Sequence, residues 1–329
     1  MISRHTRFDF SRISFNAGLL VREMQKRGIS VNYIPGTEIL LAKSGKHSEL
    51  LFDIQTRLIP YTTGLMIDDK MYAKRFLQGQ GINVALGRTF TKDDIKEALL
   101  YAGKIGYPVV LKPTFGSHGD NVYLGLKDDR ELERIIAVYL EKEPESGYFL
   151  IEKQCPGQEY RIFVARNGFF AAVKRIPANI TGNGRDNVLI LIQSENKRRM
   201  NPRNNCLCEI RLDDITFEFM EKNNLTVDYV PGKGEKVFLR GNSNVSTGGN
   251  CYDVTNTVHP SVLKLAKKIL NTYAVPFIGI DLLTADIAKD IKDDYVICEV
   301  NSAPGLSLHM LPEKGLSRNV AGAIVDLLF

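Results

Sequence analysis

One acidic residue lies inside an otherwise apolar segment, and it limits how the chain can fold. Asp281 stands in the run Phe277–Leu283, whose other members are hydrophobic or glycine. Such a run is typical of a buried strand. A carboxylate buried there is costly unless a cation pairs with it or a metal ion binds it. The chain must therefore bring a partner to Asp281.

Glu299 and Asn301 end a second apolar strand pattern and supply two more oxygen donors. They are two residues apart, so in an extended strand both side chains lie on the same face. Two carboxylates and an amide oxygen, without histidine or cysteine, are donors that Mg²⁺ accepts together with phosphate and water. The pattern favours two interpretations equally: Asp281, Glu299 and Asn301 bind a metal, or the two acids pair with lysine or arginine.

Lys112 ends the apolar segment Pro108–Leu111 and precedes a loop of small residues. The loop contains Gly116, Ser117, His118 and Gly119. A lysine at a strand end and flexible backbone amides can together hold a polyphosphate. The loop is not a Walker motif, because no Gly-Lys-Ser/Thr follows, and an ordinary turn is the alternative.

Two further segments carry polar groups next to expected strand ends. In the first, the strand pattern Phe149–Lys153 runs into a Pro-Gly turn with Glu152 before it and Glu159 after it. Its backbone could pair with an adenine edge and a carboxylate could bind ribose, or it could be a solvated strand end. In the second, Arg240 precedes a run of small residues whose amides could hold an oxyanion, and arginine offers a fork for carboxylate or phosphate oxygens.

Charge and composition exclude several classes of function. Lys and Arg number 43 and Asp and Glu 38, and 43 − 38 gives a net charge of +5. The basic run Lys197–Arg199 has no interleaved aromatic residues, so we expect no nucleic-acid partner. Apolar runs fall short of the roughly 20 residues that a membrane span needs. We expect no membrane association, and the absence of a signal pattern and five scattered cysteines favour a cytoplasmic protein with reduced thiols.

Helix and strand patterns alternate along the chain, which favours an α/β or α+β architecture. Arg161–Arg166 and Phe169–Arg175 flank Asn167-Gly168, a strong signal for a β-hairpin. We expect Ser317 to cap the last helix.

The order of these motifs resembles the ATP-grasp superfamily of carboxylate–amine ligases. Within it the sequence is most similar to the ATP-grasp domain of cyanophycin synthetases, with the ligase module of bifunctional glutathione synthetases close behind. The stretches that carry the resemblance are Ile105–Pro113, Arg175–Gly184, Leu239–Gly249, Asp253–Pro260 and Glu299–Gly305.

The resemblance implies an α+β ATP-grasp fold of three lobes, with ATP held between two of them. The expected divisions are an N-terminal lobe over residues 1–66, a central lobe with the glycine-rich loop over 67–157, and a C-terminal lobe with the metal site over 158–329. The implied cofactors are ATP and Mg²⁺, with Mn²⁺ as the alternative ion. A homodimer is the family-level expectation.

The resemblance also implies a role for each motif residue. For ATP, Lys70 and Lys112 contact the phosphates, Gly116–Gly119 cover them, Glu152, Lys153 and Cys155 form the adenine edge, and Glu159 binds the ribose. For the metal, the implied ligands are Asp281, Glu299 and Asn301. For the chemistry, Arg240 joins Lys112 as a catalytic residue, and Arg175, Asn244, Ser246, Thr247 and Gly248 line the acceptor side.

We therefore expect a stand-alone ATP-dependent ligase that joins amino acids or small peptides. A carboxylate would be activated as an acyl phosphate and then attacked by an amine, with release of ADP and phosphate. The alternatives are a glutathione-synthetase-like or non-peptide amide ligase, or a non-catalytic ATP-binding subunit.

Overall fold

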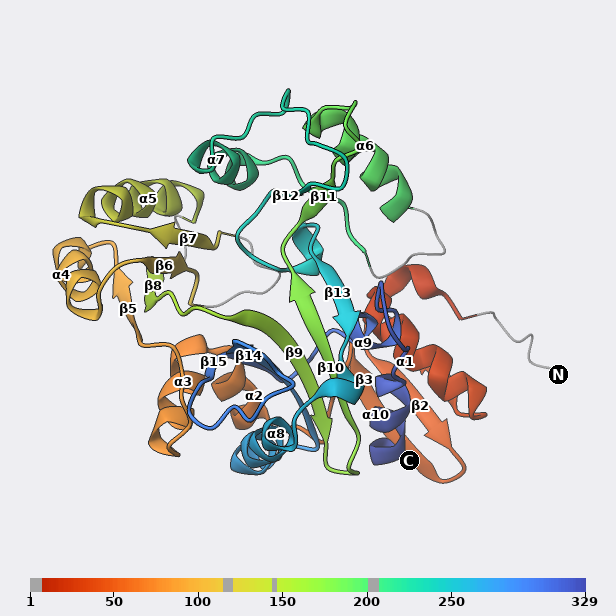
Figure 1. Ribbon diagram of the computed structural model, residues 1–329. Coiled ribbons are helices and arrows are strands. Elements are labelled where there is room, and N and C mark those ends of the chain that lie inside the picture. Colours follow the sequence, from red (N-terminus) through yellow and green to blue (C-terminus); the bar gives the residue numbers. More distant parts are fainter. Residues whose placement is uncertain (1–7, 115–120, 144–146, 201–206) are drawn as a thin grey trace.

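The computed structural model describes residues 8–114, 121–143, 147–200 and 207–329, and Figure 1 shows their arrangement. Within these ranges the strands form four antiparallel sheets, in the orders β1-β2-β3-β4, β5-β8-β6-β7, β13-β10-β9-β14-β15 and β11-β12. The predicted mixture of helices and sheets is confirmed. No helix in these ranges is both long enough and apolar enough to cross a membrane.

The N-terminal sheet shares one core with helices from near both ends of the chain. Its strands are β1 (Ser30–Tyr33), β2 (Leu40–Ser44), β3 (His47–Phe52) and β4 (Gln55–Thr56), and its helices are α1 (Phe15–Lys26) and α10 (Val320–Leu328). Leu20 and Met24 of α1 share one core with Ile324 of α10. The same core contains Phe163 and Phe277, so this sheet is anchored on the large C-terminal sheet.

The middle sheet forms a separate lobe. Its strands are β5 (Gly87–Thr91), β6 (Val109–Lys112), β7 (Tyr123–Leu126) and β8 (Tyr148–Lys153), and its helices are α4 (Ile95–Ile105) and α5 (Asp129–Lys142). Helix α5 buries Leu132, Ile135, Ile136 and Tyr139, which recur at the spacing of one helical face. This face packs on the apolar side of the sheet, so the lobe has a core of its own.

The five-stranded sheet is the largest and carries the three predicted metal ligands together with Glu159 and Arg175. Its strands are β9 (Gln158–Ala165), β10 (Phe170–Ile176), β13 (Asn250–Asp253), β14 (Phe277–Thr284) and β15 (Val296–Asn301), and the helices beside it are α2 (Tyr61–Asp68), α3 (Lys70–Gly79) and α8 (Pro260–Tyr273). Ile162 and Ile280 point toward α8 and α3 in one apolar core. Because side chains alternate along a strand, Arg161 and Asp281 lie on the opposite face.

A smaller unit is inserted between β10 and β13. It contains β11 (Asn179–Thr181), β12 (Lys236–Phe238), α6 (Val188–Arg199) and α7 (Asp214–Lys222) around a core of its own. Short helices elsewhere are the 3-10 helices Phe10–Arg12, Val245–Thr247 and Thr255–Thr257, and α9 (Ser307–Met310). In Figure 1 the β9–β10 hairpin runs up the middle of the molecule toward this unit.

Two local predictions have different outcomes. The hairpin at Asn167-Gly168 is confirmed, because β9 and β10 pair on either side of it and Gly168 adopts φ 88°. The prediction that Ser317 caps the last helix is wrong. Asn319 caps α10 by accepting from the Gly322 amide, while the Ser317 hydroxyl donates to the Met310 carbonyl.

Candidate active site between the central and C-terminal sheets

Asp281 is held by two arginines from neighbouring strands. It stands opposite Arg161 of β9 and opposite Glu299 of β15 in the sheet register. Arg161 Nη2 donates to Asp281 Oδ2 over 2.9 Å, and Arg175 Nη1 donates to the same oxygen over 3.1 Å. Burial raises the pKa of Asp281, but the two guanidinium groups lower it below its ordinary value. The structure therefore shows the second interpretation of Asp281, in which this acid pairs with arginine.

A second cluster, of lysines and acids, lies between the middle sheet and α3. Lys112 Nζ lies 2.6 Å from Glu152 Oε2, and Lys74 Nζ lies 2.7 Å from Glu152 Oε1. Lys70 Nζ lies 3.7 Å from Glu299 Oε1, which connects this cluster to the C-terminal sheet. All three lysines and Glu152 are buried. The structure thus brings the predicted phosphate ligands Lys70 and Lys112 together with Glu152, predicted at the adenine edge, and Glu299, predicted as a metal ligand.

The protonation states of this cluster follow from burial and pairing. Burial raises the pKa of Glu152, but Lys112 and Lys74 outweigh it and hold that pKa below its ordinary value. Burial lowers the pKa of Lys112, but Glu152 and Glu299 raise it above its usual range. For Lys70 burial dominates, and its pKa is lowered. Glu152 is therefore an anion between two cations at neutral pH.

Local sequence explains how α3 presents its lysines. Asp69 caps the helix, and its Oδ1 accepts from the Met71 and Tyr72 amides at 2.8 Å each. Lys70 is the first residue of the helix, and Lys74 follows one turn later, so both lie on the same face. Sequence reasoning missed Lys74. The four-residue spacing from Lys70 was the available signal for it.

The predicted acceptor residues also converge. Arg175 Nη1 lies 2.8 Å from Glu159 Oε1, and its Nη2 donates to the Asn244 side chain. Thr247 Oγ1 donates to the Asn244 carbonyl over 3.0 Å. Gly248 ends the 3-10 helix that contains Ser246, with φ 99°, and a Cβ there would lie 2.6 Å from the Ile210 Cα. The Asn244–Gly248 segment therefore forms a tight turn beside Arg175.

Seven other predicted positions are placed differently or lie outside the described residues. Arg240 is buried, and its guanidinium donates to Thr216 Oγ1 over 3.0 Å and to the Asp213 carboxylate, both at the start of α7. Lys153 Nζ donates to the Gly106 and Tyr107 carbonyls, while the half-buried Cys155 follows it at the end of β8. The loop residues Gly116, Ser117, His118 and Gly119 lie outside the part of the chain that the structure describes.

The three residues predicted to bind a metal carry suitable oxygen donors, but they differ in how far other side chains already occupy those oxygens. Glu299 is partly exposed, and its 3.7 Å contact with Lys70 leaves lone pairs accessible. Asn301 Nδ2 is buried and has no hydrogen-bond partner among the described residues. Asp281 is already engaged by arginines. Across the described ranges, no group of three or more His, Cys, Asp or Glu side chains could hold a metal ion. Any metal would therefore depend on Glu299, on the Asn301 amide oxygen and on oxygens from a ligand.

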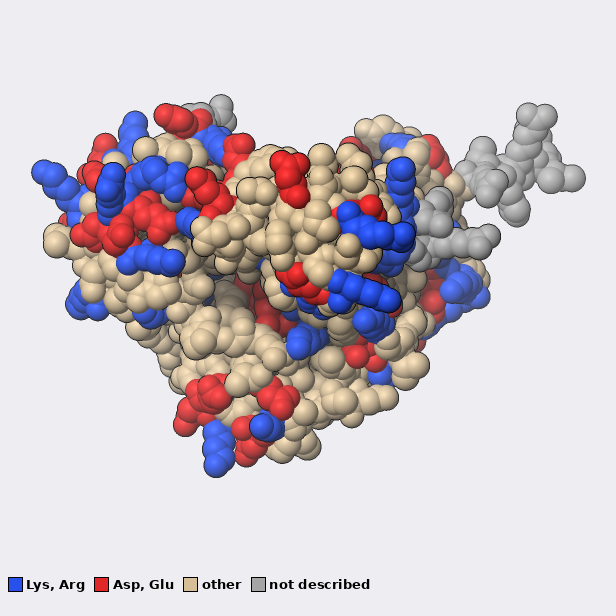
Figure 2. Space-filling view, turned by 45° about the horizontal axis from the view of Figure 1, so that its top comes forward, with Lys and Arg blue, Asp and Glu red and all other residues tan. Residues whose placement is uncertain are grey.

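One face of the molecule is hollowed (Figure 2). Figure 2 shows the surface hollowed near the middle of the view, with acidic side chains in the depth of the hollow. Lysines from α3 and β6 and carboxylates from β8 and β15 thus meet between two antiparallel sheets. This combination defines an ATP-grasp fold.

Comparisons with known proteins agree with this assignment. Residues 69–223 match the family described as the ATP binding domain of the carbamoyl-phosphate synthase L chain. The cyanophycin synthetase of Trichormus variabilis is 32% identical over 314 residues, which cover 94% of this chain and 34% of that protein. The chain has the ATP-grasp fold and is similar along its length to ATP-grasp proteins.

Two glutathione-related proteins are also similar. The glutathione biosynthesis bifunctional protein of Clostridium perfringens is 29% identical over 332 residues, covering 97% of this chain and 42% of that protein. The crystal structure of a bifunctional glutathione synthetase from Pasteurella multocida superposes with a TM-score of 0.68 at 26% identity, over 97% of this chain and 44% of that one. The chain spans between a third and a half of the length of these relatives.

Proposed function

We propose that this chain is an ATP-dependent carboxylate–amine ligase that forms a peptide or amide bond. The observation that carries the proposal is the meeting of Lys70, Lys74 and Lys112 with Glu152 and Glu299 between two sheets. Buried lysines at this density suit the phosphates of ATP, because they neutralise charge without reorganisation of solvent. The similarity to cyanophycin synthetase and to glutathione biosynthesis proteins supports ligation as the reaction.

In this proposal the central lobe over residues 67–157 and the C-terminal lobe over 158–329 enclose the nucleotide, and residues 1–66 form the third lobe. Lys70 and Lys112 hold the phosphates, together with the loop Gly116–Gly119. Glu152 and the backbone of Lys153 to Cys155 face the adenine, and Glu159 faces the ribose. Because Glu152 already balances Lys112, ATP binding must redistribute this charge.

Mg²⁺, or Mn²⁺ in its place, would be held by Glu299 and Asn301 with support from Asp281. Such an ion supplies neutralisation of phosphate charge when it is bound. The protein's own contribution is to fix the strand register that puts Glu299 opposite Asp281 and beside Lys70.

The reaction would proceed in two transfers. A substrate carboxylate oxygen attacks the γ-phosphorus and ADP leaves. An amine nitrogen then attacks the carbonyl carbon, the amine loses a proton, and phosphate leaves. Arg175 and the turn Asn244–Gly248 orient the acceptor side, including Ser246 and Thr247. Arg240 is proposed to stabilise the oxyanion, which requires it to exchange its contacts with α7 for substrate.

The proposed substrates are amino acids or small peptides, and the proposed location is the cytoplasm. Cys155 and Cys298 form no disulfide with any residue that the structure describes, which supports a reducing compartment.

The test measures phosphate release with ATP, Mg²⁺ and pools of amino acids and dipeptides. Hydroxylamine added to the same mixture converts an acyl phosphate to a hydroxamate. We expect release that depends on both a carboxylate and an amine, and hydroxamate when the amine is omitted. Bound ATP without release in any pool would contradict the ligase and favour a non-catalytic ATP-binding subunit. A pool containing glutamylcysteine and glycine separates a glutathione-synthetase-like reaction from the others.

A further inference from the structure

A polar cavity lies outside the lysine cluster, in the inserted unit. Its volume is about 380 Å³, which is within the range of small-molecule sites. Residues of β11, α6, β12 and β13 line it, together with Glu313 and Lys314. None of the predicted ATP or metal residues is among them.

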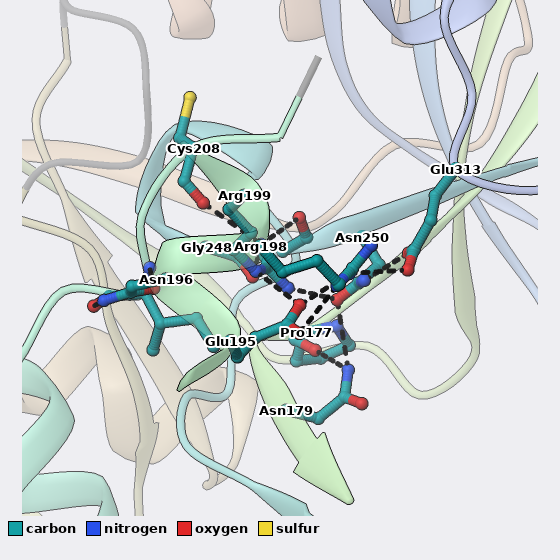
Figure 3. A network of polar contacts seen from close by, with 12 residues as sticks. Pro177, Asn179, Glu195, Asn196, Arg198, Arg199, Cys208, Gly248, Asn250 and Glu313 are labelled. Carbon is teal, nitrogen blue, oxygen red and sulfur yellow. Dashed lines mark hydrogen bonds and ion pairs between the residues drawn. The ribbon is translucent and has the colours of Figure 1, made fainter. Parts of the chain in front are cut away.

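Three of the lining residues, Glu195, Asn250 and Glu313, belong to a network of polar contacts around Arg199. Arg199 is buried at the end of α6, where its Nε donates to Glu195 over 2.8 Å and its Nη1 to the Gly248 carbonyl over 2.8 Å. Its Nη2 donates to Asn250 Oδ1 over 3.1 Å, and Asn250 in turn donates to Glu313. Figure 3 shows these side chains converging from separate segments. The cavity is therefore a preformed feature.

The walls carry both signs of charge. Arg198 is already neutralised, because its Nη2 lies 2.6 Å from Glu195 and 3.0 Å from Glu313. Lys236 and Lys314 also line the cavity, and neither forms an ion pair with any residue that the structure describes. Lys314 Nζ lies 4.7 Å from the centre of the Tyr252 ring. Two cations are thus available beside acids that are already paired.

The cavity is coupled to the candidate active site through the β10–β13 pair. Asn250 stands opposite Ile176, and Cys251 stands opposite Arg175. Arg175 contacts Asp281 and Asn244, and Gly248, at the end of the same turn, accepts from Arg199. A molecule in the cavity would therefore lie one residue along the sheet from the proposed acceptor residues.

We propose that this cavity binds the carboxylate end of an amino-acid or small-peptide substrate, which Lys236 and Lys314 recognise. The inference rests on the proposed ligase function. Three cations and two acids line the cavity, a net charge of +1, which suits a zwitterion better than a polyanion. The substrate's carboxylate meets the two lysines, and its polar backbone meets the asparagine and glutamate side chains of the wall.

The experiment measures binding to the whole chain by titration calorimetry with Mg²⁺ and a non-hydrolysable ATP analogue. The probes are the twenty protein amino acids and glycylglycine, each as the free acid and as the C-terminal amide, and inorganic phosphate. The variant combines Lys236→Gln with Lys314→Gln. The control combines Lys233→Gln with Lys267→Gln, which removes the same two charges from exposed positions that do not line the cavity.

We expect at least one acid to bind better than its amide, and the double variant to lose that preference with about a tenfold weaker Kd, which corresponds to about 1.4 kcal/mol. The control should bind like the wild-type chain. Three results would overturn the inference: no probe binds, the double variant keeps the preference, or phosphate binds with the same lysine dependence while acids and amides bind equally.

The two proposals fail separately. If the double variant releases phosphate with the same substrate KM as the wild-type chain, the ligase proposal is retained and the cavity is not a substrate site. Lysine-dependent binding of an acid without any phosphate release would support the cavity and contradict the ligase.

Discussion

Replacement of Asp281 by asparagine should destabilise the protein even when no nucleotide or metal is present. The substitution removes the charge that faces Arg161 and Arg175, both of which are buried. Breaking a buried ion pair by neutralising one partner costs about 3–5 kcal/mol, because the remaining charge is left uncompensated. Arg175 keeps Glu159 as a second partner, so we expect the loss to lie near about 3 kcal/mol.

The measurement is urea unfolding in buffer containing a chelator, followed by circular dichroism. The matched control is Asp326→Asn, because Asp326 also pairs with an arginine, Arg27, but at the surface. A surface pair contributes about 0–1 kcal/mol, so the control should change little. If Asp281→Asn is as stable as the control, the arginines do not depend on Asp281, and the reasoning from burial and pairing is refuted.

The pH dependence of this effect has a definite sign. The folded pKa of Asp281 is lowered, so its stabilising contribution is present above the unfolded pKa of about 3.9 and is lost as the pH falls through the lower, folded pKa. The difference between the wild-type chain and Asp281→Asn should therefore be constant from about pH 5 to pH 8. A difference that disappears in this range would contradict the assignment.

Three further predictions follow from the same clusters. Burial lowers the pKa of His309 to about 3, so stability should fall by up to about 1.4 kcal/mol per pH unit below about pH 6.5, and His309→Phe should remove that slope in acid unfolding curves; an unchanged slope would contradict it. Lys112→Ala should abolish phosphate release, and Lys74→Met should raise KM for ATP about tenfold, in steady-state assays with folding checked by circular dichroism; wild-type kinetics in either would refute the lysine site. Glu299→Gln should raise the Mg²⁺ concentration needed for half-maximal release, whereas an unchanged Mg²⁺ titration would remove Glu299 as a ligand.

Much of the fold followed from local pattern. The Asn167-Gly168 turn and the apolar strand that ends at Lys112 are both present as predicted. Turn chemistry, caps and apolar periodicity act over a few residues, so one sequence is enough to read them. The cap of the last helix was misplaced by two residues because Ser317 and Asn319 are both good caps, and packing decided between them.

For the site, the sequence determined that a carboxylate at position 281 needs a partner, since no apolar strand can bury it alone. It also singled out Lys70, Lys112 and Glu299, which lie close together in the structure. Only the tertiary structure decided that Arg161 and Arg175 pair with Asp281 and that Lys74 shares Glu152 with Lys112. These choices depend on strand register and on helix docking, which join residues as much as 120 positions apart, and only the four-residue spacing of Lys74 from Lys70 marked one of them in the sequence.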